Sequence, residues 1–136
     1  MKWNFKQGFT LTELLLAVII LAFSITGILL LFVNCAFFNE ANRNLSVASS
    51  HSQFVMEEIR GEASTGFSSL KVHIDAGNWD WDTATINSRG LTALNNEVID
   101  TFASGTEPLD VLITVTWKDR SGRDRSAAIE TLIGPG

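Results

Sequence analysis

Cysteine and proline are scarce in this sequence of 136 residues, and each scarcity has a consequence for the fold. The single cysteine, Cys35, excludes an intrachain disulfide, although the part beyond residue 33 is small and buries little surface. That part therefore needs another support, and we expect a long helix to provide it. No proline interrupts residues 9–60, so the backbone of that whole segment can be helical.

Sequence patterns of catalysis and metal binding are also missing. The sequence contains no P-loop, no glycine-rich dinucleotide fingerprint and no Ser-His-Asp set. His51 and His73 are isolated, without a second histidine or a cysteine at the spacing of metal ligands. We therefore predict that the protein is not an enzyme and that it needs neither a cofactor nor a metal ion.

Positive charge is limited as well. The formal net charge is −5, and residues 34–136 carry fourteen Asp and Glu against eight Lys and Arg. This balance argues against binding to nucleic acids, whose phosphates require cationic partners. The exception is a cluster of Lys118, Arg120, Arg123 and Arg125, offset by Asp119 and Asp124. The cluster would suit DNA capture, but we favour solvated charges that limit pairing at a sheet edge.

Residues 14–33 form a run of twenty residues without any charge. As a helix the run spans about 30 Å, which matches the hydrocarbon core of a bilayer. Lys2 and Lys6 precede it, whereas the first basic residue after it is Arg43. This bias predicts a cytoplasmic N-terminus and an exported remainder, in a single-pass inner-membrane protein. The run is too long for a conventional cleaved signal peptide.

The helical pattern continues beyond the apolar run. Residues at steps of three and four form one stripe of an amphipathic helix. Its members are Phe38, Ala41, Leu45, Ala48, Ser52, Val55 and Ile59. We predict one helix of about 50 residues over 9–60, with Gly61 as its stop. Gly27, together with Ser24 and Thr26, is its only weak point.

Residues 62–96 are rich in Gly, Ser, Asn, Asp and Thr, and the sequence predicts no firm secondary structure there. The alternation of Leu70, Val72 and Ile74 would suit a strand. The oxygen-bearing residues within 78–82 resemble the start of a calcium loop, but Thr83 replaces its glycine and Arg89 its closing glutamate. The favoured interpretation is an exposed loop whose two tryptophans are either packed down or available to a partner.

The C-terminal part predicts antiparallel strands. Residues 96–103 would suit a helix or a strand, and we favour the strand. Residues 111–117 and 126–133 alternate between apolar and polar side chains, and residues 119–122 supply a turn between them. The predicted fold class is α+β: a long N-terminal helix with a small antiparallel sheet packed on its outer half.

Glu13 stands at the start of the apolar run, where an ionised side chain is costly and usually marks function. A simple alternative is that it only reaches back to the membrane boundary. A basic leader precedes Glu13, with Gly8 five residues and Phe9 four residues before it. This pattern argues for the functional interpretation.

Residues 8–15, Gly-Phe-Thr-Leu-Thr-Glu-Leu-Leu, resemble the class III signal of type IV pilins and type II secretion pseudopilins. The resemblance implies that a membrane prepilin peptidase cuts between Gly8 and Phe9 and methylates Phe9. It also implies that Glu13 forms an assembly salt bridge with the freed amine of Phe9 on a neighbouring subunit. Its expected partners are the peptidase, other pilins or pseudopilins through the N-terminal helix, and the inner membrane before assembly.

A finer resemblance favours a minor subunit. Residues 48–60 and 115–122 are similar to minor pilins of the pilus-modification class and minor pseudopilins of the I type. The chain lacks the helix-bending proline and C-terminal disulfide of major pilins. The implied division is a leader (1–8), a transmembrane assembly half-helix (9–33), an amphipathic half-helix (34–60) and a β-rich exported region (61–136). The alternative is an unprocessed, signal-anchored sensor or accessory domain.

Overall fold

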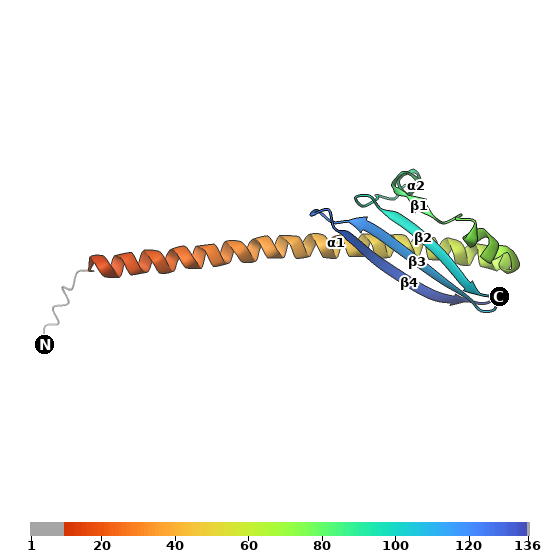
Figure 1. The fold of residues 1–136 in the computed structure, drawn as a ribbon, viewed down its shortest axis with the longest axis horizontal. Coiled ribbons are helices and arrows are strands. Elements are labelled where there is room, and N and C mark those ends of the chain that lie inside the picture. Colours follow the sequence, from red (N-terminus) through yellow and green to blue (C-terminus); the bar gives the residue numbers. More distant parts are fainter. Residues whose placement is uncertain (1–9, 136) are drawn as a thin grey trace. The chain divides into compact units, whose positions relative to one another are not determined.

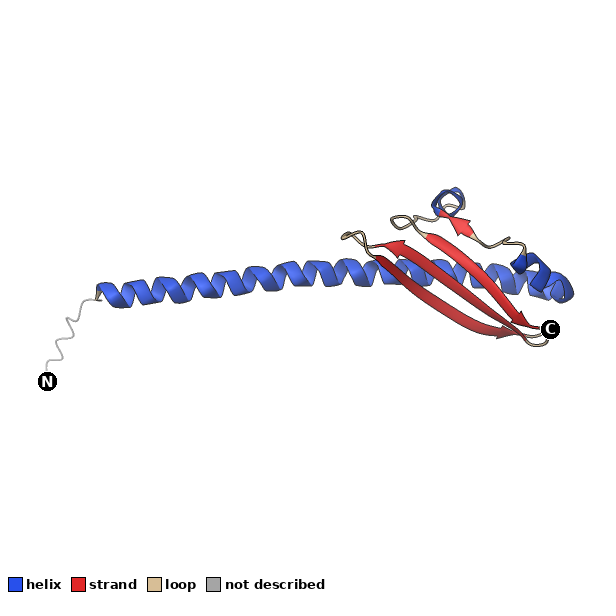
Figure 2. Ribbon diagram, in the orientation of Figure 1, coloured by secondary structure: helices blue, strands red, loops and turns tan. Residues whose placement is uncertain are grey.

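The computed structural model describes residues 10–135. The chain divides into two compact units, Met1–Glu40 and Ala41–Gly136. Helix α1 covers Leu11–Asp75 (Figure 2) and has a kink at Gly66, where the backbone angles are not helical and two helical segments meet. In the first unit, α1 is the secondary structure of every described residue except Thr10. The second unit contains the remainder of α1 and all the strands.

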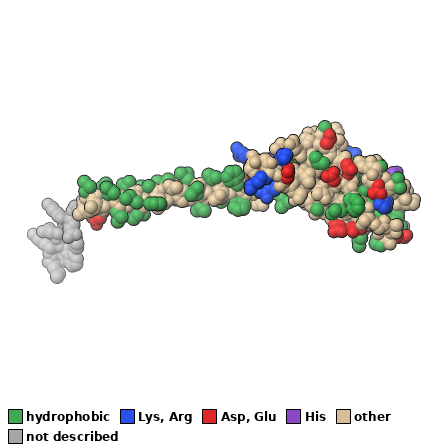
Figure 3. All heavy atoms as spheres, in the orientation of Figure 1, with side chains coloured by type: hydrophobic (Ala, Val, Ile, Leu, Met, Phe, Trp, Pro, Cys, Tyr) green, Lys and Arg blue, Asp and Glu red, His purple; other side chains and the backbone are tan. Residues whose placement is uncertain are grey.

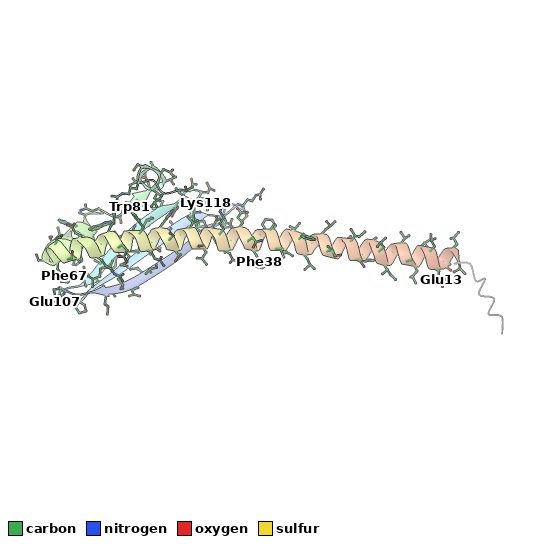
Figure 4. The ribbon with its side chains drawn as sticks, turned by 180° about the vertical axis from the view of Figure 1, so that it is seen from behind. Glu13, Phe38, Phe67, Trp81, Glu107 and Lys118 are labelled. Atoms are coloured by element: carbon green, nitrogen blue, oxygen red, sulfur yellow. The ribbon has the colours of Figure 1, made fainter. Side chains whose placement is uncertain are left out.

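The sheet has four antiparallel strands in the order β1-β2-β3-β4 (Figure 1). Their bounds are Trp81–Asp82, Val98–Gly105, Leu109–Lys118 and Asp124–Ile133, and a short helix, α2, at Thr83–Ser88 follows β1. The sheet covers one face of the second part of α1, in front of it in Figure 1 and behind it in Figure 4. The predicted α+β class is therefore confirmed, as are the strand near 96–103 and the C-terminal hairpin.

Alternation along β3 builds the core of the second unit. Every odd-numbered residue from Leu109 to Trp117 is buried, because successive side chains of a strand point to opposite faces. These side chains pack against the buried face of α1, whose fully buried members include Ala48, Val55, Ile59, Leu70 and Ile74. Burying a large aliphatic side chain contributes about 1.5–3 kcal/mol, so this interface is the main support of the unit.

The predicted stop of α1 at Gly61 is wrong, because the helix continues to Asp75. Leu70 and Ile74 lie four positions apart, a spacing that fits one face of a helix as well as one face of a strand. Both are buried, whereas Val72 between them is 66% exposed. The strand considered for residues 70–74 is therefore also wrong. The helical stripe is buried only from Ala48 onwards, since Phe38 and Leu45 are largely exposed.

The turn between β3 and β4 is held by Asp119 and Gly122. Oδ1 of Asp119 accepts the backbone N–H groups of Ser121 and Arg123 at 2.9 and 3.0 Å. The hydroxyl of Ser121 also donates to Oδ1 of Asp119. This bond first, and the backbone bonds after it, lower the pKa of Asp119 well below its usual range. Gly122 completes the turn with a φ of +78°, a conformation that favours glycine.

We expect Gly122→Ala to lower the free energy of unfolding by about 1–2 kcal/mol, because a Cβ atom is strained at positive φ. Nothing lies within 4 Å of the added atom, so the effect would come from the backbone alone. Gly134→Ala is the matched control, since that position is equally open and has no positive φ. Thermal denaturation of the full chain in detergent would show a lower melting temperature for the first variant only.

Candidate functional site

The N-terminal turn of α1 contains the described part of the predicted assembly site. Gly8 and Phe9, the predicted processing site, lie outside the described residues. Glu13 lies in the first turn of the helix (Figure 4). There its negative charge is favoured by the positive end of the helix dipole.

Thr10 and Glu13 form a capping box. The backbone N–H of Glu13 donates to Oγ1 of Thr10 at 3.3 Å, while Oε2 of Glu13 accepts the N–H of Thr10 at 3.2 Å. The hydroxyl of Thr10 also lies 3.2 Å from the same Oε2. Such reciprocal bonds satisfy two donors that a helix start leaves without partners. The Thr-x-x-Glu spacing is visible in the sequence, but the sequence reasoning did not use it.

The capping box has a consequence for the chemistry of Glu13. Its carboxylate is held at the helix start by neutral donors of its own chain. An ammonium group is a stronger partner for a carboxylate than a neutral N–H, because charged hydrogen bonds are about twice as strong. The arrangement therefore positions an anion that can exchange its local donors for a cation.

Beyond Glu13, the described part of the first unit presents an apolar surface. The side chains from Leu14 to Val33 are exposed, and the helix is long and apolar enough to cross a membrane by length and composition. The hydroxyls of Ser24 and Thr26 each donate to the carbonyl four residues earlier, at 2.8 Å. These polar groups are therefore satisfied within the helix, as a hydrocarbon environment requires.

In the second unit, the sequence analysis missed a buried pair of ionisable side chains. Nδ1 of His51 on α1 lies 2.7 Å from Oε1 of Glu97, and the two side chains are 6% and 0% exposed. Oε2 of Glu97 accepts the backbone N–H of Leu94 at 2.6 Å, and Thr83 donates its hydroxyl to the carbonyl oxygen of Glu97. Glu97 thus connects α1, α2 and the loop before β2.

Of the two alternatives for the tryptophans of residues 78–82, packed down or available to a partner, the structure shows the first. Trp79 and Trp81 are buried, and the guanidinium of Arg89 lies 4.0 Å from the ring centroid of Trp81. Oδ1 of Asp80 accepts the N–H of Thr101, and Oδ1 of Asp82 caps α2 through Thr85, which lowers the pKa of Asp82. Among residues 10–135, no group of three or more His, Cys, Asp or Glu could hold a metal ion.

The cationic cluster at the β3–β4 turn is largely paired within the chain. Nζ of Lys118 lies 2.8 Å from Asp124, and Nε of Arg125 lies 3.1 Å from Oδ2 of Asp119. Nε of Arg123 lies 3.4 Å from the same oxygen. These contacts support the interpretation of the cluster as solvated charges.

Comparison with known proteins adds one finding. Residues 3–33 match the family model described as the prokaryotic N-terminal methylation motif. None of the curated proteins and none of the solved structures compared with the chain matches it.

Proposed function

We propose that this chain, whose N-terminal segment is that of a type IV pilin-like protein, is a minor structural subunit. It would belong to a type IV pilus or to a type II secretion pseudopilus. The observation that carries the proposal is the methylation motif over residues 3–33, which includes Gly8, Phe9 and Glu13. Such a motif implies processing by a prepilin peptidase and assembly with other pilins.

Processing would create the partner that Glu13 needs. Cleavage between Gly8 and Phe9 frees an amino group, and methylation of Phe9 leaves that group cationic. In a bundle of helices the amine of one subunit then pairs with Glu13 of its neighbour. Opposite charges attract far more strongly in a low-dielectric bundle than in water. Leaving Glu13 unpaired in hydrocarbon costs about 3 kcal/mol, so the pairing favours one register of assembly.

The division of the chain follows from this mechanism. Residues 1–8 are a leader, and residues 9–33 anchor the protein in the inner membrane before assembly and bundle with other helices afterwards. Lys2 and Lys6 keep the N-terminus in the cytoplasm. The second unit is exported, with the amphipathic part of α1 as its support. A minor role is supported by the absence of proline from residues 9–60 and by the single cysteine.

The alternative is an unprocessed, signal-anchored sensor or accessory domain. Intact mass of the protein purified from its own cells distinguishes the two functions, because the first requires a chain that starts at methylated Phe9. A chain that keeps Met1 and the whole leader, in cells with an active prepilin peptidase, would overturn the proposal. The genes beside its own would separate a pilus from a secretion system.

We expect Gly8→Val to abolish cleavage, because branching at Cβ crowds the backbone that the peptidase must bind. Intact mass would show the full leader and an unmethylated chain. Gly27→Val is the matched control: nothing lies within 4 Å of the added Cβ, and the site is remote in sequence from the cut. That variant should be processed as the wild type is.

A further inference from the structure

The two edges of the sheet differ in whether their backbone groups have partners. Beyond the two-residue strand β1, charged side chains cover the edge of β2. Oδ1 of Asp80 accepts the backbone N–H of Thr101 at 2.8 Å, and Nζ of Lys71 donates to the carbonyl oxygen of Ala103 at 2.9 Å. Such cover protects a sheet, because a row of free N–H and C=O groups at an edge can pair with another chain.

Strand β4 forms the opposite edge (Figure 1). At its turn the N–H of Asp119 donates to the carbonyl of Arg123, and bonded pairs alternate along an antiparallel ladder, so the bonds to β3 come from odd-numbered residues. The backbone groups of the even-numbered residues therefore point away from β3. Among residues 10–135, no hydrogen bond reaches these outward groups. We call the outward N–H and C=O groups of Ser126, Ala128, Glu130 and Leu132 the free edge.

The free edge is also long and regular. The ten residues of β4 pair with β3 without a bulge and contain neither proline nor glycine. Glu130 is the only charged residue between positions 126 and 133. Charged side chains, proline and bulges are the usual means of preventing a further strand from pairing. An edge with so little protection can accept an extended segment, whose backbone supplies hydrogen bonds and whose side chains supply specificity.

The core is incomplete beside this edge. In β3, Val111, Ile113 and Val115 are fully buried. Their partners in β4 lie on the same face of the sheet but are only half-buried. These partners are Thr131, Ile129 and Ala127, and the last two pack against the core. A fifth strand with apolar side chains on this face would remove them from water, which favours its binding.

Charge indicates which strand the free edge favours. Glu130 is exposed on the face that points away from α1. Residues 34–136 carry eight Lys and Arg against fourteen Asp and Glu, a net charge of −6. Figure 3 shows the Lys and Arg side chains gathered mainly at one end of the second unit. A second copy would bring the same negative charge, whereas a strand with Lys or Arg opposite Glu130 would form a favourable cross-strand pair.

We propose that the free edge binds an extended segment of a different protein, which adds a fifth antiparallel strand to the sheet. Apolar side chains of the segment cover Ala127 and Ile129, and the polar side chains between them include a Lys or Arg opposite Glu130. The backbone of the segment pairs with the outward groups of β4. This contact requires no processing of the N-terminus, so it and the proposed function fail in different experiments.

Hydrogen exchange of the full chain in detergent tests the free edge by itself. We expect the N–H groups of Ala128 and Glu130 to exchange at least about tenfold faster than those of Ala127 and Ile129, which bond to β3. Equal protection of the two sets would show that the chain or a second copy already covers this edge, and it would overturn the proposal.

A synthetic peptide then tests the added strand. Its eight residues alternate valine with threonine, and lysine replaces one central threonine. At millimolar concentration it should slow the exchange of the N–H groups of Ala128 and Glu130 at least about tenfold. The same peptide with glutamate in place of lysine should bind about fivefold more weakly, because like charges on neighbouring strands destabilise the pair. The lysine peptide with N-methyl groups on its threonines and lysine, whose N–H groups would face β4, should give no protection.

Variants of the full chain complete the test. Glu130→Lys should bind the glutamate peptide more tightly than the lysine peptide, the reverse of the wild-type order. Glu57→Lys is the matched control, because the side chain of Glu57 on α1 is also exposed, and it should keep the wild-type order. Ala128→Pro removes an outward N–H and no bond to β3, so it should fold and bind the lysine peptide at least about tenfold more weakly.

The possible failures of these measurements are distinct. Melting temperatures show whether the variants fold, and if Ala128→Pro does not, the N-methylated peptide tests the same backbone bonds on the wild-type chain. The free edge does not bind a strand if the lysine peptide gives no protection or if the N-methylated peptide protects equally. The cation opposite Glu130 has no role if folded Glu130→Lys keeps the wild-type order of the two peptides.

Discussion

Replacing Glu97 by alanine should destabilise the second unit by about 3–5 kcal/mol, the cost of removing one partner of a buried pair. The substitution leaves His51, which is 4% exposed, without its acceptor and the N–H of Leu94 without its bond. A buried donor left unsatisfied loses its hydration without compensation. Chemical denaturation of the full chain in detergent, followed by circular dichroism, would measure the loss.

Exposed and conservative variants make this prediction specific. Glu57→Ala also removes a carboxylate from an ion pair, but the side chain of Glu57 is 73% exposed, so we expect less than about 1 kcal/mol. Glu97→Gln keeps one oxygen to accept the N–H of Leu94, and its NH2 group can donate to Nδ1 of a neutral His51, so it should cost less than Glu97→Ala. Equal effects of Glu97→Ala and Glu57→Ala would show that the buried pair contributes nothing to stability.

This pair marks a limit of prediction from the sequence. His51 and Glu97 are 46 positions apart and belong to different elements, so no spacing in the chain indicates that they meet. In addition, no secondary structure was predicted for residues 62–96, which lie between them in the chain, because these residues have the composition of a loop. In the structure, much of that segment is helix α1 and helix α2, which are stabilised by packing rather than by propensity.

Periodicity predicted the elements that have one polar face and one buried face. The alternation of Val111, Ile113 and Val115 led directly to β3, and Asp119 with Gly122 indicated its turn. Periodicity failed where the pattern was short, because the spacing of Leu70 and Ile74 fits the period of a helix and the period of a strand equally well. The prediction that the helix ends at Gly61 failed for a different reason. A glycine ends a helix only where no later residue favours its continuation, and here Ala63 and Leu70 are buried against the sheet.

Glu13→Leu should leave processing intact and abolish incorporation into filaments. In the proposed function the peptidase would act at the preceding Gly8-Phe9 bond, whereas assembly would require an anion that pairs with the freed amine of a neighbour. A leucine there is well tolerated in hydrocarbon, so the variant would stay in the membrane with no charge to draw it into register. Intact mass would show methylated Phe9 at its N-terminus, and immunoblots of sheared filaments would show no subunit.

A second variant is needed to separate the charge of Glu13 from its role in the capping box, because Glu13→Leu also removes the hydrogen bond that Glu13 accepts from the N–H of Thr10. Glu13→Gln keeps an acceptor for that N–H and loses only the charge, as glutamine replaces glutamate in capping boxes. If the charge directs assembly, both variants are processed and both are absent from filaments. If Glu13→Gln assembles and Glu13→Leu does not, the helix cap and not the ion pair is what assembly needs. Filaments that contain Glu13→Leu at the wild-type level would remove Glu13 from the mechanism altogether.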